Sequence, residues 1–170
     1  KRNALAWRLG AIMLQHAFKE WAVMCEALAR GRQAIILRKG GIEEEFTLEN
    51  RAFWLYPTYV HQQADGVNEA LRGMLDEVRA SQPSAGTIRL SHWAEVTAAF
   101  RIRDLLHAQL LAHLHGWSDE TVCKRFEYRT PGLTVLAVRV YRSGAAHTLN
   151  ESPAYAGRRS WVELDRPLST

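Results

Sequence analysis

Residues 88–103, IRLSHWAEVTAAFRIR, alternate between two kinds of side chain along their whole length. One set is mainly apolar and comprises Ile88, Leu90, His92, Ala94, Val96, Ala98, Phe100 and Ile102. The other set is mainly polar and includes three arginines. Because side chains of a strand point alternately to its two faces, this pattern predicts one long bent strand, or two strands joined by a bulge at Ala98-Ala99. We expect one buried and one basic face.

The segments around this strand predict a sheet covered by helices. Further strands are expected at residues 35–37, 42–48, 53–57, 133–141 and 161–164, of which 133–141 is the most continuous apolar run and therefore central. Helices are expected over residues 16–30, 67–78 and 104–116, and from Ser118 onward. Leu106, Leu110 and Leu114 would form the apolar stripe of the third helix.

Strands and helices mix without a regular βαβ alternation, which favours the α+β class over a doubly wound sheet. The expected architecture is one domain over residues 1–170, with a small, mostly antiparallel sheet, either open or barrel-like, and three to four flanking helices. The only segment that resembles a linker, SQPSAG at 81–86, has the length of an ordinary connection.

Composition restricts the function classes. The chain has 170 residues, 47% of them hydrophobic, and a net charge of +4 from 18 Arg, 4 Lys and 18 acidic residues. This charge permits nucleic-acid binding without requiring it. Two distant cysteines without metal-ligand spacing predict neither a disulfide scaffold nor a zinc site and fit a cytoplasmic protein. No apolar run is long enough to span a bilayer. We expect no metal and no cofactor.

The stretch LRKGGIEEEF at 37–46 offers a candidate anion site. Arg38 and Lys39 supply positive charge, and Gly40-Gly41 would allow backbone N–H groups to approach a phosphate. The spacing matches neither a Walker nor a Rossmann phosphate loop, so a hairpin turn is the favoured interpretation. The three following glutamates would point to alternate faces of a strand, which disfavours a metal site.

Two histidines are candidate acid/base or binding residues. His92 lies on the apolar side of the long strand, where a histidine needs a hydrogen bond, and a paired core residue is the commoner outcome. His61, with Gln62, follows YPTYV at the expected mouth of a loop and is the better site candidate. Four aromatic residues would form either core or a base-stacking surface: Trp54, Tyr56, Tyr59 and Trp93.

Five motifs together resemble a bacterial family known as domain of unknown function 1802. They are AFKEWAVMCEAL (17–28), LRKGGI (37–42), FWLYPTYVHQ (53–62), RFEYRTPGLTVLAVRVYR (125–142) and YAGRRSW (155–161). The resemblance runs from about Phe18 to Leu164. One departure is that the family pattern tends to place Cys after the glycine of the last motif, where this chain has Arg158.

The resemblance implies a cytoplasmic bacterial domain, in some cases associated with restriction-type nucleases, and it supplies no catalytic residue. It also implies a set of recurring residues that this chain retains: Lys19, Glu20, Trp21, Arg38, Lys39, Gly40, Gly41, Tyr56, Pro57, His61, Gln62, Arg125, Arg139 and Tyr141.

The leading hypothesis is a nucleic-acid-associated accessory domain. In this hypothesis Arg38, Lys39 and nearby arginines hold phosphate, while Tyr56, His61 and Gln62 contact a base. One alternative is an enzyme acting on a small phosphorylated or nucleotide-like substrate, with His61 or His92 as the acid/base. The other is a structural interaction module with an exposed apolar patch. The candidate ligand-binding residues are Arg38, Lys39, Tyr56, His61, Gln62, His92, Arg125 and Arg139.

Overall fold

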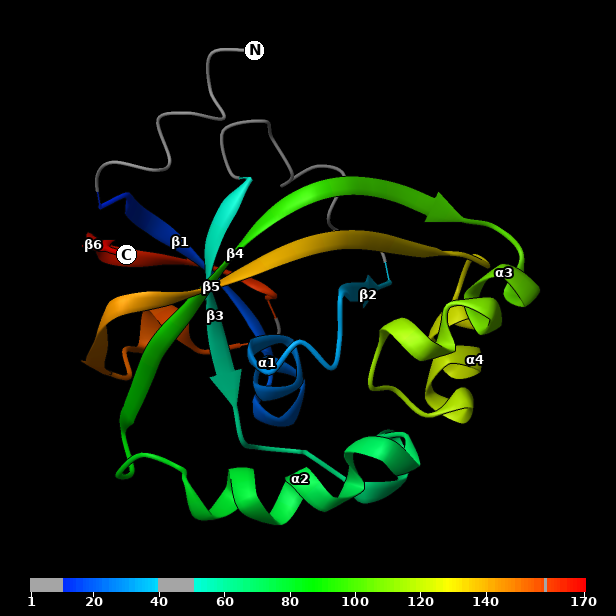
Figure 1. The fold of residues 1–170 in the computed structure, drawn as a ribbon, viewed down its shortest axis with the longest axis horizontal. Helices are drawn as coiled ribbons and strands as arrows, with labels where there is room; N and C mark the ends of the chain where they lie inside the picture. Colours follow the sequence, from blue (N-terminus) through cyan, green and yellow to red (C-terminus); the bar gives the residue numbers. More distant parts are fainter. Residues whose placement is uncertain (1–10, 40–50, 158) are drawn as a thin grey trace.

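The computed structural model describes residues 11–39, 51–157 and 159–170, which form a six-stranded sheet and four α-helices (Figure 1). The strands are β1 (Met13–Trp21), β2 (Ile35–Arg38), β3 (Ala52–Thr58), β4 (Thr87–Ile102), β5 (Leu133–Asn150) and β6 (Trp161–Ser169). The helices are α1 (Ala22–Ala29), α2 (Glu69–Ala80), α3 (Leu105–Leu110) and α4 (Asp119–Glu127), with short 3-10 turns η3 (Ala64–Gly66), η4 (Ala112–Leu114) and η5 (Pro153–Tyr155). The α+β class is confirmed.

The long strand expected at 88–103 forms β4, which pairs antiparallel with β5 from Thr87 to Ile102. The pairing register shifts between Val96 and Ala98, next to the expected bulge, and again between Leu90 and His92. These bulges let the two strands bend across the whole molecule (Figure 1). As predicted, β5 is an interior strand, because β2 and β4 flank it.

The sheet order is β2-β5-β4-β3-β1-β6, and the expectation of a mostly antiparallel sheet was wrong. The sheet is mixed because β1 and β3 run parallel, with Lys19 opposite Tyr56 and Trp21 opposite Thr58. Between these two strands the chain passes through α1 and places β2 at the far edge before it returns. The barrel-like alternative is also wrong, because the described strands leave β2 and β6 as two separate edges.

Two helix predictions were also wrong in part. The segment 16–30 divides at Trp21 into β1 and α1, because residues up to Trp21 pair with β3 on one side and residues up to Phe18 with β6 on the other. In α3 the side chains of Leu106 and Leu110 are 58% and 63% exposed, so they form no buried stripe. The turn at Gly40-Gly41 and the strand at 42–48 lie outside the described residues.

The core lies on both faces of the sheet and holds the parallel strands firmly. On one face α1, α2 and α4 pack through Met24, Leu71 and Phe126 onto β2 and β5. On β3, the side chains of Phe53 and Trp54 are fully buried in two further clusters. The ends of β1 and β3 therefore lie at a fixed position in the sheet. No helix within the described ranges is long and apolar enough to cross a membrane.

Candidate functional site

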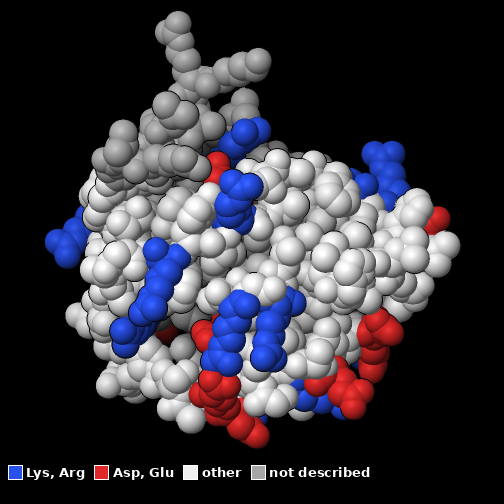
Figure 2. All heavy atoms as spheres, in the orientation of Figure 1, with Lys and Arg blue, Asp and Glu red and all other residues white. Residues whose placement is uncertain are grey.

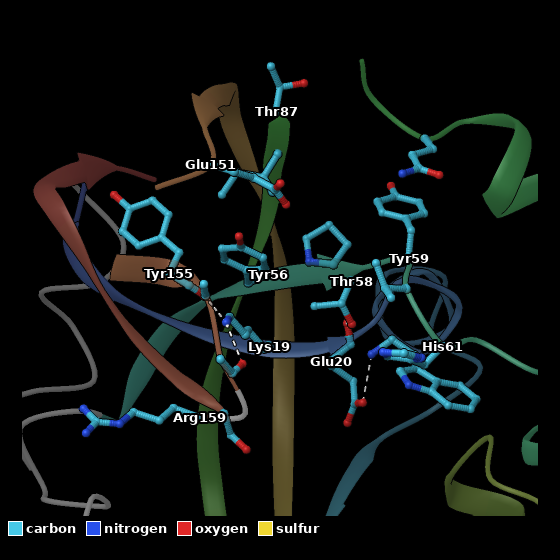
Figure 3. Close-up of a pocket in the computed structure, with 18 of the residues that line it drawn as sticks. Lys19, Glu20, Tyr56, Thr58, Tyr59, His61, Thr87, Glu151, Tyr155 and Arg159 are labelled. Atoms are coloured by element: carbon cyan, nitrogen blue, oxygen red, sulfur yellow. Dashed lines mark hydrogen bonds between the residues drawn. The ribbon is translucent and has the colours of Figure 1, made fainter. Parts of the chain in front are cut away.

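The carboxyl ends of the parallel strands β1 and β3 line a pocket of about 810 Å³ (Figure 3). Residues 19–21 of β1 and 56–58 of β3 form its floor, because register pairs them one to one. Its other walls come from residues 59–61, from 82 and 84–88 at the start of β4, and from 151, 152, 155–157, 159 and 160 around η5. The pocket thus joins segments that are far apart in the sequence.

Three tyrosines supply the aromatic walls: Tyr56, Tyr59 and Tyr155. The Tyr56 ring is 4% exposed and meets the Tyr155 ring edge-to-face at 6.4 Å between centroids. Among the described residues the Tyr56 hydroxyl has no hydrogen-bond partner, and Figure 3 shows it near Glu151. Burial, reinforced by Glu151 and Tyr155, raises the pKa of Tyr56 to about 12. This phenol therefore stays protonated and can donate to a ligand.

Lys19 holds the wall formed by residues 155–157. Its ammonium donates to the backbone carbonyl of Tyr155 and, at 3.4 Å, to that of Gly157. It also lies 5.7 Å from the centroid of the Tyr56 ring, within the range of a cation–π contact. Burial lowers the pKa of Lys19, while Glu151 acts in the opposite direction. Two of its three donors are used within the protein, so Lys19 positions the wall and adds positive charge.

A buried cluster of Glu20, Arg38 and Arg125 underlies the pocket. The Glu20 side chain is 2% exposed; its Oε1 accepts a 2.9 Å hydrogen bond from the Trp21 N–H, and its Oε2 lies 3.8 Å from Arg38 Nη2. Arg38 stacks 4.5 Å from the Phe18 ring centroid and donates to the Lys19 carbonyl. The cluster therefore joins β1 to the end of β2.

Arg125 completes this cluster from α4, with its guanidinium 3.6 Å from the centroid of the Trp117 ring. Burial lowers the pKa of Arg125 to about 10, with Glu20 raising it and Arg38 lowering it, so the group stays charged at neutral pH. Three buried atoms of the cluster have no hydrogen-bond partner within the part of the chain that the structure describes: Glu20 Oε2, Arg38 Nε and Arg125 Nη1. A buried charge that is incompletely paired is costly, which marks this cluster as unusual.

Four of the eight candidate residues line the pocket: Arg38, Tyr56, His61 and Arg125. His61 is exposed and has a left-handed backbone, with φ of 70°, in the turn that leaves β3. This backbone conformation is uncommon for residues other than glycine, although histidine adopts it more often than most. The structure thus brings together residues from β2, β3, the following turn and α4.

The other four candidates lie elsewhere. Lys39 donates to three backbone carbonyls, of Phe126, Thr130 and Gly132, and so fastens the connection after α4. Gln62 is 5% exposed, and its Oε1 accepts a 2.8 Å hydrogen bond from Val23 N in the first turn of α1. Both side chains have structural partners where the sequence suggested ligand contacts.

His92 lines a smaller cavity of about 210 Å³ together with Cys25 and Tyr59. Its Nδ1 lies 3.0 Å from Ser91 Oγ, and burial lowers its pKa. Arg139 is exposed on β5, opposite Glu95 of β4. Neither residue reaches the larger pocket.

Several pocket residues were not among the candidates: Lys19, Glu20, Trp21, Tyr59, Glu151, Tyr155 and Arg159. The first three were assigned to a helix, and only the recurring KEW triplet at 19–21 hinted at a shared role. The motif YAGRRSW contains Tyr155 and Arg159, but nothing local connects it with β3. Among the described residues, no group of three His, Cys, Asp or Glu side chains is arranged to hold a metal ion.

Surface charge on the face drawn in Figure 2 is dispersed. The described Lys and Arg side chains are scattered over this face and form no single continuous strip, while acidic side chains gather at its lower edge, over α2. Helix α2 contains Glu69, Asp76 and Glu77. The described residues of this face therefore form no extended basic track for a nucleic-acid backbone.

Comparison with known proteins identifies a family and a fold. The family model described as "Domain of unknown function (DUF1802)" matches residues 17–170, nearly the whole chain and slightly more than the resemblance suggested. A search of curated proteins gave no match. None of the findings supports the restriction-type nuclease partner that the resemblance implied.

Among solved structures, the chain is similar to the ASCH protein of Zymomonas mobilis. A tyrosine-to-phenylalanine variant of that protein matches with a TM-score of 0.52 and 12% identity, over 88% of each chain. The unmodified ASCH structure matches with a TM-score of 0.46 and 13% identity, over 73% of this chain and 66% of the other. At this identity the likeness concerns the fold alone.

Proposed function

We propose that this protein, which belongs to the DUF1802 family, is a nucleic-acid-binding domain that takes one nucleotide unit into the pocket at the ends of β1 and β3. The observation that carries the proposal is the convergence of cationic and aromatic side chains on a single cavity. Lys19, Arg38, Arg125 and Arg159 line it together with three tyrosines. A volume of about 810 Å³ lies within the range of cavities that hold small ligands, roughly 300–1,000 Å³.

Arg38 and Arg125 are suited to the phosphate. A guanidinium presents a planar set of donors that matches the oxygens of a phosphate, and it remains charged when buried. Both side chains are held in place by a ring, Phe18 beneath Arg38 and Trp117 beneath Arg125. Their positions are therefore largely set before a ligand arrives, which reduces the entropy lost on binding.

The tyrosines are suited to the base in different ways: Tyr59 is partly exposed and offers ring surface for stacking, whereas Tyr56 and Tyr155 are 4% and 3% exposed and offer polar or edge contacts. Stacking on an aromatic ring contributes roughly 1–3 kcal/mol per base in single-strand binding proteins. The protonated Tyr56 hydroxyl can donate to a ring nitrogen or carbonyl of the base, and the Glu151 carboxylate can accept from an exocyclic amine. An unstacked base of a single strand would reach this pocket more readily than a paired base.

A single-nucleotide pocket predicts a weak salt dependence. Each phosphate neutralised on a single strand contributes a slope of about −0.7 to the logarithm of affinity against the logarithm of salt. Engagement of one or two phosphates therefore predicts a slope of about −0.7 to −1.4. The dispersed charges of Figure 2 agree with so few contacts.

Fluorescence anisotropy with short labelled oligonucleotides, single- and double-stranded, RNA and DNA, tests the proposal. We expect single strands to bind with the slope given above, and the double variant Arg38→Ala/Arg125→Ala to lose roughly ten- to a hundredfold in affinity. Arg139→Ala removes an exposed arginine far from the pocket and is the matched control. A flat salt dependence, or equal losses in the control, would overturn the proposal.

An enzyme acting on a nucleotide-like substrate is the second candidate, because the exposed His61 lines the same pocket and histidine is the side chain that most often serves as a general acid or base. Free mononucleotides distinguish the two. Turnover that is lost in His61→Gln while mononucleotide binding is kept would favour the enzyme. Tight binding of oligonucleotides without any change to them would favour the binding domain.

A further inference from the structure

We infer that the pocket selects the phosphorylated end of a nucleic acid, a phosphate monoester, over an internal phosphodiester. This inference rests on the proposed function and adds to it the chemical class of the bound group. It follows from three features of the pocket: its net charge, the free donors of its two partly buried arginines, and the incomplete pairing of the cluster formed by Glu20, Arg38 and Arg125.

The charges that line the pocket leave an excess of two positive charges. Four cations line it, Lys19, Arg38, Arg125 and Arg159, against the two carboxylates of Glu20 and Glu151, with His61 counted as neutral. A phosphate monoester carries about −1.5 to −2 charges at pH 7, whereas a phosphodiester carries one. Only the monoester would neutralise the pocket fully.

The two guanidinium groups also present unused donors to the pocket. Arg38 Nη2 is occupied by the Lys19 carbonyl, and Arg38 Nε and Arg125 Nη1 are buried. Two further nitrogens, Arg38 Nη1 and Arg125 Nη2, are not among the buried unpaired atoms. They also have no hydrogen bond to any residue that the structure describes. A monoester offers three terminal oxygens to such donors, and a diester offers only two.

Glu20 explains why the site is cationic without being unstable. Its carboxylate lies 3.8 Å from Arg38 and also raises the pKa of Arg125, so one of the two guanidinium charges is offset within the protein. The second charge has no counter-ion among the described residues within ion-pair distance. A bound dianion would supply the missing counter-ion. Screening by water is weak there, because the neighbouring Glu20 side chain is only 2% exposed.

The experiment compares four forms of one single-stranded oligonucleotide: 5′-phosphate, 5′-hydroxyl, 3′-phosphate and 3′-hydroxyl, each with an internal label. We expect at least one phosphorylated form to bind roughly ten- to a hundredfold more tightly than its hydroxyl partner. The preference should shrink when the pH is lowered from 7.5 to 5.5, because the second ionisation of a monoester lies near pH 6.

Substitutions of Arg125 distinguish selection of a phosphate monoester from a purely structural role of this residue. Arg125→Ala should bring the ratio between phosphorylated and hydroxyl forms close to one, and Arg125→Lys, which keeps the charge, should retain part of it. Arg139→Ala should leave the ratio unchanged. If circular dichroism shows that Arg125→Ala does not fold, the inference is tested with Arg125→Lys and with the pH dependence of the wild-type affinity ratio between phosphorylated and hydroxyl forms.

The two proposals fail in different ways. If all four oligonucleotides bind equally well and Arg125→Ala weakens them all alike, the pocket holds an internal phosphate, and the end-specific inference is wrong while the proposed function stands. If no oligonucleotide binds but a nucleoside monophosphate does, the proposed function is wrong and the monoester site remains. If inorganic phosphate fails to compete with a bound phosphorylated end even at high concentration, the monoester site is wrong.

Discussion

Arg38 and Lys39 are neighbours in the sequence, but their side chains reach two regions of the molecule that differ in how polar groups are paired. Lys39 lies against the connection after α4, where its ammonium donates to three backbone carbonyls. Arg38 belongs to the cluster beneath the pocket, where three buried polar atoms of Glu20, Arg38 and Arg125 have no hydrogen-bond partner among the described residues. Two adjacent cations thus have different roles.

The pairing of each side chain decides whether its positive charge is available to a ligand. Hydrogen bonds to backbone carbonyls occupy the donors of Lys39, so this residue stabilises the fold. In the cluster of Glu20, Arg38 and Arg125 the guanidinium donors exceed the acceptors that the described residues supply, and such an imbalance is costly unless a ligand or water corrects it.

Glu20→Ala should destabilise the protein most. The change removes the carboxylate that lies 3.8 Å from Arg38 and that raises the pKa of Arg125. Removing one partner of a buried ion pair typically costs about 3–5 kcal/mol. Urea unfolding, followed by circular dichroism, would measure the loss. A change below about 1 kcal/mol would show that the floor is solvated and that the contrast with Lys39 is unfounded.

A pH titration of stability tests a second buried group near Arg125. The His115 side chain is 3% exposed, its Nδ1 accepts a 3.2 Å hydrogen bond from the Trp117 N–H, and burial lowers its pKa to about 4. A histidine with a depressed folded-state pKa contributes stability that is present above its unfolded pKa, about 6.5, and is lost as the pH falls toward 4.

We therefore expect the free energy of unfolding to fall by roughly 3 kcal/mol between pH 7 and pH 4 on account of His115. His115→Asn, which keeps an acceptor for the Trp117 N–H and cannot be protonated, should lack this component. Equal pH profiles for the two proteins would mean that His115 is accessible to water.

How far the sequence predicts this molecule depends on whether a signal is local. The alternation at 88–103 and the apolar run at 133–141 predicted β4 and β5, because both strands bury their side chains in a regular pattern. Ser118 was correctly expected to begin a helix, and its Oγ accepts from Thr121 N. These features depend on residues a few positions apart.

The pocket depends on residues far apart, and the sequence indicated only part of it. Phe18 and Trp21 have a spacing that fits a helix, so the parallel pairing of β1 with β3 was missed, and with it the place of Lys19 and Glu20. Arg38 and Tyr56 were identified through their residue types. Glu151 and Tyr155 reach the same cavity only because β5 returns across the sheet. No local sequence pattern predicts this course of the chain.

Lys39→Met should lower stability by roughly 1–2 kcal/mol, because the aliphatic chain remains while the charge-assisted hydrogen bonds to three carbonyls are lost. Nucleic-acid affinity should stay within about twofold of the wild type, because Lys39 does not line the pocket. Parallel urea unfolding and anisotropy would measure both quantities. A large loss of affinity without a loss of stability would reverse the contrast between Lys39 and Arg38.

The smallest effect on stability is expected for Tyr56→Phe. The Tyr56 hydroxyl has no partner among the described residues, so its removal should change the free energy of unfolding by less than about 0.5 kcal/mol, while ligand affinity falls. Tyr155→Phe is the matched control, since its hydroxyl accepts a 3.1 Å hydrogen bond from Asp165 N, and its loss should cost about 1 kcal/mol. Equal stability losses in both variants would contradict this assignment.

Whether the pocket is the nucleotide site can be measured by NMR, from the indole N–H signals of the tryptophans during titration with a 5′-phosphorylated single-stranded oligonucleotide. Trp21 lines the pocket, whereas Trp54 is fully buried with its indole N–H bonded to the Leu14 carbonyl at 3.2 Å. We predict a saturable shift of the Trp21 signal and almost none of the Trp54 signal. A titration in which the oligonucleotide binds but Trp21 does not respond would contradict the assignment of the pocket as the nucleotide site.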